Sequence, residues 1–150
     1  MTGWEAANPG FEQNVRNAVL TMPAARHLGF AFGRIAPGEA ELIQPVTKEL
    51  TQHDGFAQAG VLGSLADFAA GSAAGTLLPP GWSNMTIDYT VKFLAPANGE
   101  EIVARGRVVK PGNLITIAAA DIYAVAGLAK TETLCAVALV TLRNVRVAKA

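Results

Sequence analysis

Residues 56–77, FAQAGVLGSLADFAAGSAAGTL, decide the fold that we predict for this chain. The run lacks proline and is rich in alanine and leucine, and the Leu-Pro-Pro-Gly sequence at 78–81 ends it abruptly. It therefore predicts one helix of about 20 residues, roughly 30 Å long. Glycines and alanines leave much of its surface without long side chains, so that other backbones can approach it closely.

Sequence typical of β-strands lies on both sides of this helix. Before it, residues 30–36 and 39–46 flank Pro37 and Gly38, which predicts a hairpin. After it, four runs alternate between apolar and polar residues or are otherwise suited to strands, at 84–96, 100–110, 114–125 and 131–145. Four consecutive strands joined by tight turns favour an antiparallel sheet.

The N-terminal segment adds a second helical element. Phe11, Val15, Val19 and Met22 recur at helical spacing, so residues 9–27 predict an amphipathic helix that is broken or kinked at Pro23. The order of helix, two strands, long helix and four strands predicts an α+β fold, with a curved antiparallel sheet of about six strands wrapped around the long central helix. We expect residues 1–150 to form a single domain.

Composition excludes several classes of function. Charged residues make up 16% of the chain, against roughly 25% in average soluble proteins, so another subunit is expected to cover part of the surface. Twelve basic residues balance twelve acidic ones without a basic stripe, which excludes nucleic acid as the expected partner.

The N-terminus lacks the pattern of a secretory signal, and no apolar run is long enough to span a membrane. Asp67 and Asp121 interrupt the two most apolar stretches. The single cysteine, Cys135, cannot form an internal disulfide and is expected to be a small buried apolar residue rather than a nucleophile. We therefore expect a soluble, cytoplasmic protein that does not bind membranes.

A carboxylate in the middle of an enclosed apolar helix needs an explanation. The neighbours of Asp67 on the same helical face are Gly63, Ser64, Ala70 and Gly71, and none of them is a cation. Asp67 is therefore expected to face a cleft or a closely approaching second chain. The alternative is that it reaches solvent or an ion-pair partner elsewhere in the molecule.

The start of the same helix suggests an anion-binding element. Gln58, Ala59 and Gly60 lie where backbone N–H groups have no partner within the helix, and the helix dipole favours negative charge there. Such amides can polarise a thioester carbonyl and stabilise the oxyanion that forms on attack. Gln58 and Asp67 are roughly 10 to 14 Å apart along a helix, so one carbonyl can reach both only if a two-fold partner supplies one of them.

The arrangement D-G-F-x-x-A-G-V-L-x-x-L-A-D-x-A-A-G, at residues 54–71, resembles the active-site segment of hotdog-fold acyl-CoA thioesterases of the phenylacetic-acid-degradation (PaaI-like) type. Residues 85–113 are similar to the strand, Pro-turn, strand and Gly-turn of that family, and the order of elements agrees from about Arg26 to Leu142. The resemblance implies a hotdog fold, a homodimer or homotetramer with its active site at the dimer interface, an acyl-CoA substrate and no cofactor.

Position by position, the resemblance implies a role for five residues. Asp67 would be the nucleophile or the general base for water, and Gln52 would contact the water or the thioester. Gly60 would donate its backbone N–H to the thioester oxygen, and Thr86 would orient the water. Gln58 stands where the family commonly has histidine; glutamine can donate a hydrogen bond or cap the helix, but it cannot shuttle a proton.

Other residues are weaker candidates. His53 could be a displaced catalytic histidine but is better explained as a loop residue, and Asp54 precedes a glycine as turn residues do. The two histidines lack the spacing of a zinc site, so no metal is expected. Three basic residues on predicted strands could contact the phosphates of coenzyme A: Arg105, Arg107 and Lys110. For each of them, a position on a solvated strand face is the more common explanation.

These observations predict an acyl-CoA thioesterase that converts an aryl or medium-chain acyl-CoA to the free acid and coenzyme A. The acyl group would lie along the small-residue face of the long helix and the neighbouring strands. Because Gln58 replaces the usual histidine, a non-catalytic acyl-CoA or small-ligand binding protein of the same fold is the alternative. A dehydratase of the related hotdog type is a third possibility, but no histidine paired with an acid stands out.

Overall fold

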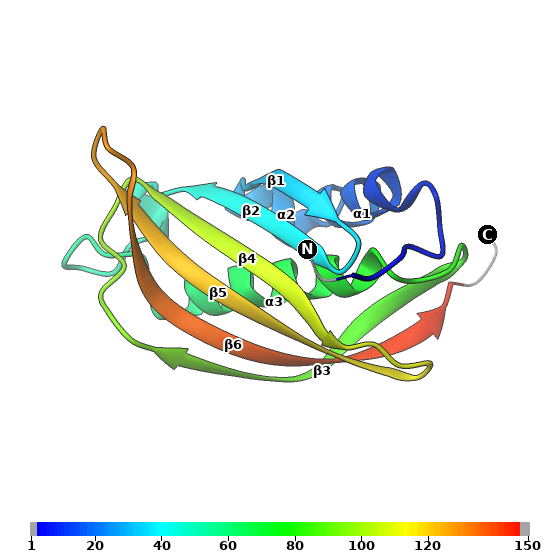
Figure 1. Cartoon of the computed structure of the whole chain (residues 1–150). Helices are drawn as coiled ribbons and strands as arrows, with labels where there is room; N and C mark the ends of the chain where they lie inside the picture. Colours follow the sequence, from blue (N-terminus) through cyan, green and yellow to red (C-terminus); the bar gives the residue numbers. More distant parts are fainter. Residues whose placement is uncertain (1–2, 148–150) are drawn as a thin grey trace.

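The computed structural model describes residues 3–147, in which a curved six-stranded sheet wraps around one long helix (Figure 1). The helices are α1 (Phe11–Leu20), α2 (Pro23–Leu28) and α3 (Ala59–Gly75), and a short 3-10 helix, η1, spans Lys48–Leu50. The strands are β1 (Ala31–Ala36), β2 (Glu39–Pro45), β3 (Trp82–Phe93), β4 (Glu101–Lys110), β5 (Ile115–Ala126) and β6 (Thr131–Arg146).

The sheet has the order β1-β2-β4-β5-β6-β3, and every neighbouring pair is antiparallel. The predicted sheet, central helix and N-terminal helical segment are therefore confirmed, and the architecture is that of a hotdog fold. Strand β3 follows α3 along the chain yet pairs with β6, so it forms the edge of the sheet opposite β1. The predicted hairpin at Pro37 is also present, and Gly38 adopts a positive φ of 77° there, which glycine accepts without strain.

Helix α3 begins at Ala59, three residues after the start of the predicted run 56–77 and within the stretch from Gln58 to Gly60 that was predicted as the helix start. Gln58 has extended backbone angles and acts as the N-cap, and Ala57 instead forms an isolated β-bridge with Thr51. The helix ends at Gly75, before the predicted Leu-Pro-Pro-Gly stop. Its inward surface is fully buried against the concave side of the sheet, through residues such as Leu65.

The small residues of α3 allow the close approach that the sequence predicted. Gly106 in β4 lies directly on the helix backbone, since a Cβ at that position would be 2.1 Å from the carbonyl oxygen of Ala69. A side chain of any size would push strand and helix apart. The interface between α3 and the centre of the sheet therefore depends on glycine from the strand and alanine from the helix.

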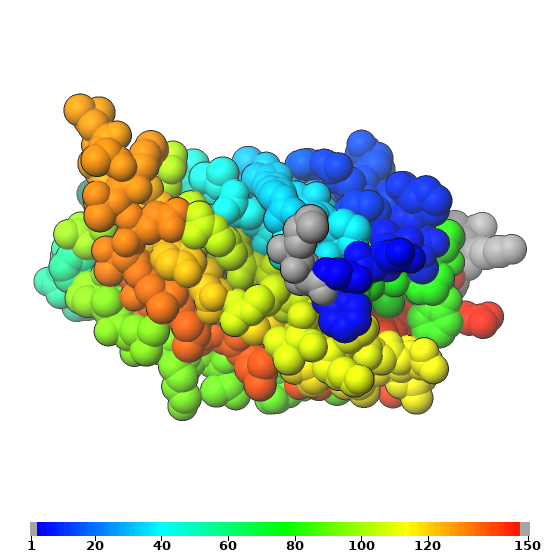
Figure 2. Space-filling view, viewed as in Figure 1, coloured from blue at the N-terminus to red at the C-terminus, as the bar shows by residue number. Residues whose placement is uncertain are grey.

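The N-terminal helical segment is broken at Pro23, as predicted, because proline begins a new helix more readily than it continues one. Helix α1 packs beside α3 through Val15 and Val19, on the side of α3 that the sheet leaves uncovered (Figure 1). The β5–β6 hairpin projects beyond the body of the molecule (Figure 2). Leu128, in the turn of this hairpin, is fully exposed. Within residues 3–147, no helix is long and apolar enough to cross a membrane.

Candidate active site

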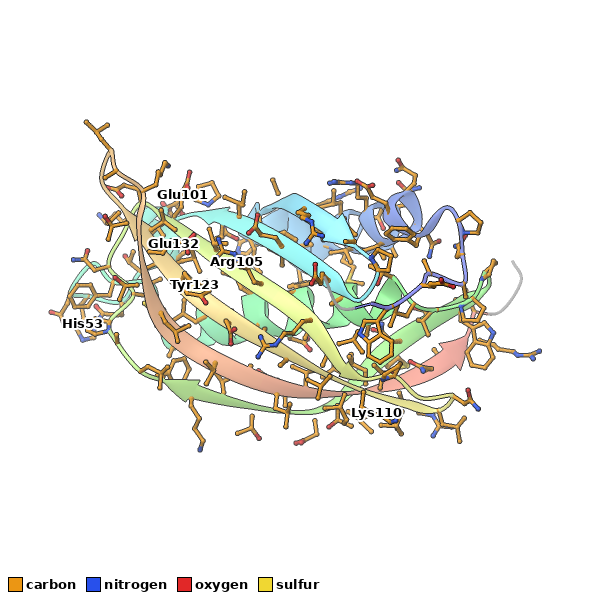
Figure 3. The ribbon with its side chains drawn as sticks, in the orientation of Figure 1. His53, Glu101, Arg105, Lys110, Tyr123 and Glu132 are labelled. Carbon is orange, nitrogen blue, oxygen red and sulfur yellow. The ribbon has the colours of Figure 1, made fainter. Side chains whose placement is uncertain are left out.

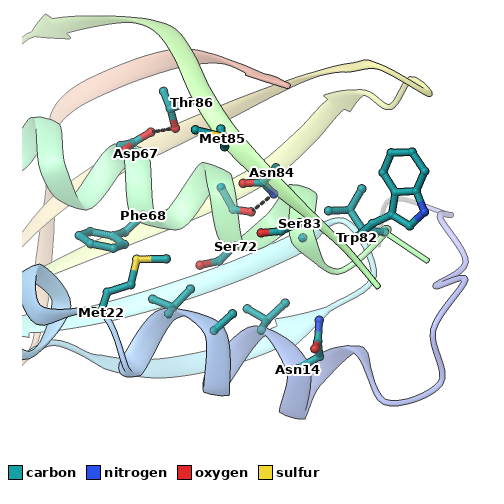
Figure 4. Close-up of a pocket in the computed structure, with 16 residues that line it drawn as sticks. Asn14, Met22, Asp67, Phe68, Ser72, Trp82, Ser83, Asn84, Met85 and Thr86 are labelled. Atoms are coloured by element: carbon teal, nitrogen blue, oxygen red, sulfur yellow. Dashed lines mark hydrogen bonds between the residues drawn. The ribbon is translucent and has the colours of Figure 1, made fainter. Parts of the chain in front are cut away.

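Asp67 and Thr86 meet where the middle of α3 passes β3 (Figure 4). The Thr86 hydroxyl donates a hydrogen bond of 2.6 Å to Oδ1 of Asp67. The other carboxylate oxygen, Oδ2, has no hydrogen-bond partner among residues 3–147, and the side chain is only half-buried. The structure thus brings together two of the five predicted site residues and leaves one carboxylate oxygen free to engage a substrate or water.

A bulge in β3 determines which side chains face the helix. Thr86 pairs with Leu142 and Asp88 pairs with Thr141, so Ile87 is an extra residue between them. The extra residue reverses the alternation of side chains along the strand. As a result Thr86 reaches Asp67 before the bulge, while Tyr89 lies over Gly63 of the same helix after it.

A cavity of about 380 Å³ opens beside Asp67 between α1, α3 and the first half of β3 (Figure 4). Most of its lining is apolar, and Gly71 and Gly75 of α3 contribute no side chains to it. It is lined by Asn14, Val15, Ala18, Val19, Met22, Asp67, Phe68, Gly71, Ser72, Gly75, Leu78, Trp82, Ser83, Asn84, Met85 and Thr86. Asp67 is the one charged side chain in this set. The cavity therefore suits an uncharged ligand group, one end of which would lie beside the Asp67 carboxylate.

The backbone amides at the start of α3 were expected to be free to bind an oxyanion, but the structure pairs them with the Gln58 side chain. Oε1 of Gln58 accepts hydrogen bonds from the backbone N–H groups of Gly60, at 2.6 Å, and Val61, at 3.2 Å. Glutamine therefore caps the helix, and the Gly60 amide already has a partner. The Nε2 group of Gln58 has no partner among the described residues, so it can donate a hydrogen bond outward.

Gln52 lies near that helix start, away from Asp67. Its Oε1 accepts a hydrogen bond from the backbone N–H of Asp54, and its side chain borders a separate depression that also contains Phe93. The predicted site residues therefore form two groups within one chain, with Asp67 and Thr86 in the first. Nine residues of helix separate Gln58 from Asp67, which corresponds to roughly 13 Å along the axis.

The weaker candidates lie outside both groups. His53 and Asp54 occupy an exposed turn at the end of the molecule, and Figure 3 shows His53 far from the sheet centre. Cys135 is fully buried in β6, where its thiol contacts backbone carbonyls. The described residues contain no cluster of three or more His, Cys, Asp or Glu side chains suited to a metal ion.

Arg105 and Arg107, considered above as contacts for coenzyme A, are both ion-paired. Figure 3 shows Arg105 beside Glu132 on the face of the sheet turned away from α3. The hydrogen bond with Glu132 raises the pKa of Arg105 above its ordinary value, and a second carboxylate, Glu41, lies 2.8 Å from the same guanidinium. The Arg105 guanidinium in turn lowers the pKa of Glu132. Lys110 lies near the opposite end of β4 from this cluster.

Comparison with known proteins identifies the family of this chain. A family model described as the thioesterase superfamily matches residues 54–129, about half of the chain. The crystal structure of a thioesterase family protein from Silicibacter pomeroyi is 35% identical to this chain, with a TM-score of 0.87, and the match covers 91% of this chain and 99% of that one. The chain belongs to the thioesterase superfamily.

Two more distant structures share the fold of this superfamily member. A thioesterase from Haemophilus influenzae has a TM-score of 0.79 at 22% identity, over 99% of this chain and 98% of that one. The PaaI protein from the phenylacetic acid degradation operon of E. coli has a TM-score of 0.74 at 20% identity, over 97% and 99%. A search of curated proteins finds no significant match.

Some features of this thioesterase-superfamily site were not predicted. The sequence showed that α1 has an apolar face, but it did not show that Val15 and Val19 close one side of the cavity. Neither Ser72 nor Asn84 was selected from the sequence, although Asn84 donates a 3.0 Å hydrogen bond to the carbonyl oxygen of Gly71. A polar residue on the small-residue face of α3, such as Ser72, was the one available signal.

Proposed function

We propose that this protein hydrolyses acyl-CoA thioesters, with Asp67 as the central catalytic residue. The observation that carries the proposal is the Asp67 carboxylate itself, which is held by Thr86 and opens onto a mostly apolar cavity in a member of the thioesterase superfamily. The cavity is large enough for an aryl or medium-chain acyl group, and the polar coenzyme A portion would remain toward solvent.

In this proposal Oδ2 of Asp67 attacks the thioester carbonyl carbon or removes a proton from a water that does so. The Thr86 hydroxyl fixes the carboxylate and helps to place the water. Either route ends with the C–S bond broken, the oxygen of one water on the acyl carbon, and a proton on the departing coenzyme A thiol. The products are a carboxylic acid and free coenzyme A.

The developing oxyanion needs hydrogen-bond donors that Asp67 and Thr86 cannot supply. We assign this role to the start of α3, where Nε2 of Gln58 is free to donate and the Gly60 amide becomes available if the Gln58 side chain rotates away. Gln52 would position the water or the thioester from the adjacent loop. Because these groups are too far from Asp67 within one chain, they would come from a second subunit.

The exposed edge of the sheet supports such a dimer. Strand β3 has a hydrogen-bonding edge that no other described strand covers, and it carries several exposed apolar side chains. Ile87, the extra residue of the bulge, is 56% exposed. Pairing of two β3 strands about a two-fold axis would bury these side chains and bring the start of one α3 toward the partner's Asp67.

The test is release of free thiol from a panel of aryl and medium-chain acyl-CoAs by the wild-type protein and by Asp67→Asn. We expect the substitution to abolish measurable turnover, because the amide can neither attack the carbonyl nor accept a proton from water. Asp54→Asn, in the exposed turn, is the matched control and should retain activity. Equal thiol release by wild type and Asp67→Asn across the panel would overturn the proposal.

A second candidate function is binding of acyl-CoA or a related small ligand without hydrolysis. One observation favours it: Gln58 stands in place of the usual histidine, and its Oε1 already accepts the hydrogen bond of the Gly60 amide. Calorimetric titration with the same panel separates the two functions. Binding to wild type and Asp67→Asn with no thiol release from either would establish the binding function in place of hydrolysis.

A further inference from the structure

A second cavity, of about 470 Å³, lies where α3 ends, between the start of β3 and the connection from β4 to β5 at residues 111–113. We call it the end cavity. Trp82 and Leu78 border both this cavity and the one beside Asp67. Figure 4 shows Trp82 on the part of β3 that is remote from Asp67. The end cavity is therefore a separate space that shares one wall with the candidate active site.

Asn144, which lines the end cavity, carries a buried polar atom without a hydrogen-bond partner. The residue is 4% exposed, and its Oδ1 accepts no hydrogen bond from residues 3–147. Oγ of Ser72, in the lining of the cavity beside Asp67, and Oε1 of Gln44 are also buried without a partner in this part of the chain. Such groups are uncommon in folded proteins, and each needs an explanation. At the end cavity the unsatisfied group is a hydrogen-bond acceptor.

The other contacts of Asn144 fix the orientation of its amide group. Nδ2 donates hydrogen bonds to the carbonyl oxygens of Gly112, at 2.8 Å, and Asn113, at 3.3 Å, and to Oγ1 of Thr116 at 3.3 Å. The backbone N–H of Asn144 donates to the carbonyl oxygen of Leu114. Exchanging the amide oxygen and nitrogen would set the oxygen against two carbonyl oxygens, so the hydrogen bonds assign the orientation. Oδ1 therefore stays available to a donor from outside the described chain, while the donors of this amide are already engaged.

The walls of the end cavity suit a flat, uncharged ring. No charged side chain lines it in the described structure, and leucine, proline and tryptophan side chains supply its apolar surface. The Arg146 guanidinium lies 5.3 Å from the centroid of the Trp82 ring, a cation–π contact that helps to hold this ring in place. An aromatic ligand packs favourably against such a side chain. A charged ligand would be buried here without a counter-charge.

We propose that the end cavity is a second binding site, for a neutral, planar heteroaromatic ring whose N–H donates a hydrogen bond to Oδ1 of Asn144. A ring N–H is a donor only, whereas a hydroxyl would also bring lone pairs that the apolar walls leave unpaired. The ring itself packs against Trp82 and the neighbouring proline and leucine side chains. This site is additional to the proposed acyl-CoA site and does not depend on hydrolysis.

The experiment titrates indole and benzofuran, which have nearly the same shape but differ in the ring N–H, into the isotope-labelled protein. NMR signals of Trp82, Asn113 and the Asn144 side chain report on the end cavity. We expect indole to bind the wild type at least roughly tenfold more tightly than benzofuran. Asn144→Ala should remove this preference. Asn84→Ala is the matched control and should keep it, because Asn84 pairs with Asn144 across β3 and β6 but bonds to Gly71 and lines the other cavity.

Several outcomes would overturn this inference, and none of them bears on thioester hydrolysis. They are no binding of either ring, equal affinity of the wild type for both rings, and a preference that Asn144→Ala retains in full. Indole that shifts only signals around the cavity beside Asp67, such as those of Val15 and Val19, would overturn it as well.

A second variant keeps the inference testable if thermal unfolding shows that Asn144→Ala does not fold. Trp82→Leu removes the aromatic wall but not the acceptor, so it should weaken the binding of both rings while indole remains the tighter ligand. Unchanged affinity of Trp82→Leu for indole would overturn the proposed site.

Discussion

The hydroxyl of Thr86 lies 2.6 Å from Oδ1 of Asp67, so strand β3 orients the carboxylate of the central helix. Removing this hydroxyl in Thr86→Ala should lower kcat by roughly ten- to hundredfold, because a misplaced catalytic group loses rate steeply with small displacements. Thr86→Ser keeps a donor at the same position and should retain most of the activity. Steady-state kinetics on the best acyl-CoA of the panel measure both. Equal losses in the two variants would show that the hydroxyl is not the important group.

The separation of Asp67 from Gln58 predicts that two subunits share each active site. Asp67→Asn and Gln58→Ala should each be weakly active or inactive alone, since each removes one half of the site. When the two variants are unfolded, mixed and refolded together, heterodimers with one intact site should restore roughly a quarter of wild-type activity. Mixed samples no more active than the average of the two parents would contradict a shared site.

The exposed edge of β3 allows the dimer itself to be tested. Ile87→Lys places a charge on the bulge of an unpaired edge and should shift the protein from dimer to monomer in analytical ultracentrifugation. Activity should fall with the dimer although Asp67 and Thr86 are unchanged. Leu128→Lys, on the fully exposed tip of the β5–β6 hairpin, is the control and should leave both properties unaltered. A fully active monomer would contradict the prediction.

Gly71 lines the cavity without a side chain. We expect this glycine to lower the stability of the fold but to leave room for the acyl group. A Cβ at this position would meet Oδ1 of Asn84 at 3.6 Å and Cδ2 of Leu142 at 3.8 Å, which are ordinary contacts. Gly71→Ala should therefore stabilise the fold by about 0.5–1 kcal/mol through helix propensity, while raising KM for bulky acyl groups. Urea unfolding and kinetics check the two effects. A destabilised variant would mean that the methyl group does not fit.

The unsatisfied hydroxyl of Ser72 predicts an unusual gain in stability. Ser72→Ala removes a buried polar group without breaking a hydrogen bond, so it should raise the free energy of unfolding by about 1 kcal/mol. Ser64→Ala breaks the hydrogen bond to Gly60 and should give no such gain. Urea unfolding of the free protein compares the two variants. A destabilised Ser72→Ala would show that the hydroxyl has a partner in the unliganded protein.

The ion pair between Arg105 and Glu132 predicts that the free energy of unfolding depends weakly on pH in the acidic range. Arg105 lowers the pKa of Glu132 in the folded protein, so the pair contributes stability above the unfolded pKa of glutamate, about 4.3, and this contribution is lost as pH falls through the lower folded pKa. Because both side chains are more than a third exposed, Glu132→Gln should destabilise the fold by less than about 1 kcal/mol at pH 7.

Unfolding experiments between pH 7 and about pH 3 test this dependence. The difference between wild type and Glu132→Gln should shrink toward the acidic end. Glu49→Gln is the control, because Glu49 has no ion-pair partner among the described residues. A difference that stays constant over the whole range would show that the effect of Glu132 is not electrostatic.

Local sequence was sufficient for the helices and strands, because proline positions, glycine turns and the spacing of apolar residues act within a few residues of chain. The same reasoning located Asp67, since a carboxylate among small residues on an apolar helix is conspicuous without any structure. Thr86 entered through the family resemblance. The proline-free run began three residues before α3, but the stretch from Gln58 to Gly60 was correctly predicted as the helix start, and Gln58 is the N-cap.

Tertiary structure decided what those elements do together. The bulge at Ile87 turns Thr86 and Tyr89 toward the same helix, which strict alternation along β3 does not allow. Packing of α1 against α3 closed the cavity and left Ser72 without a partner. These features depend on contacts between residues far apart in the chain. Local sequence therefore determined the elements and the acid residue, and long-range packing determined the cavity, the orientation of the carboxylate and the engagement of the Gly60 amide.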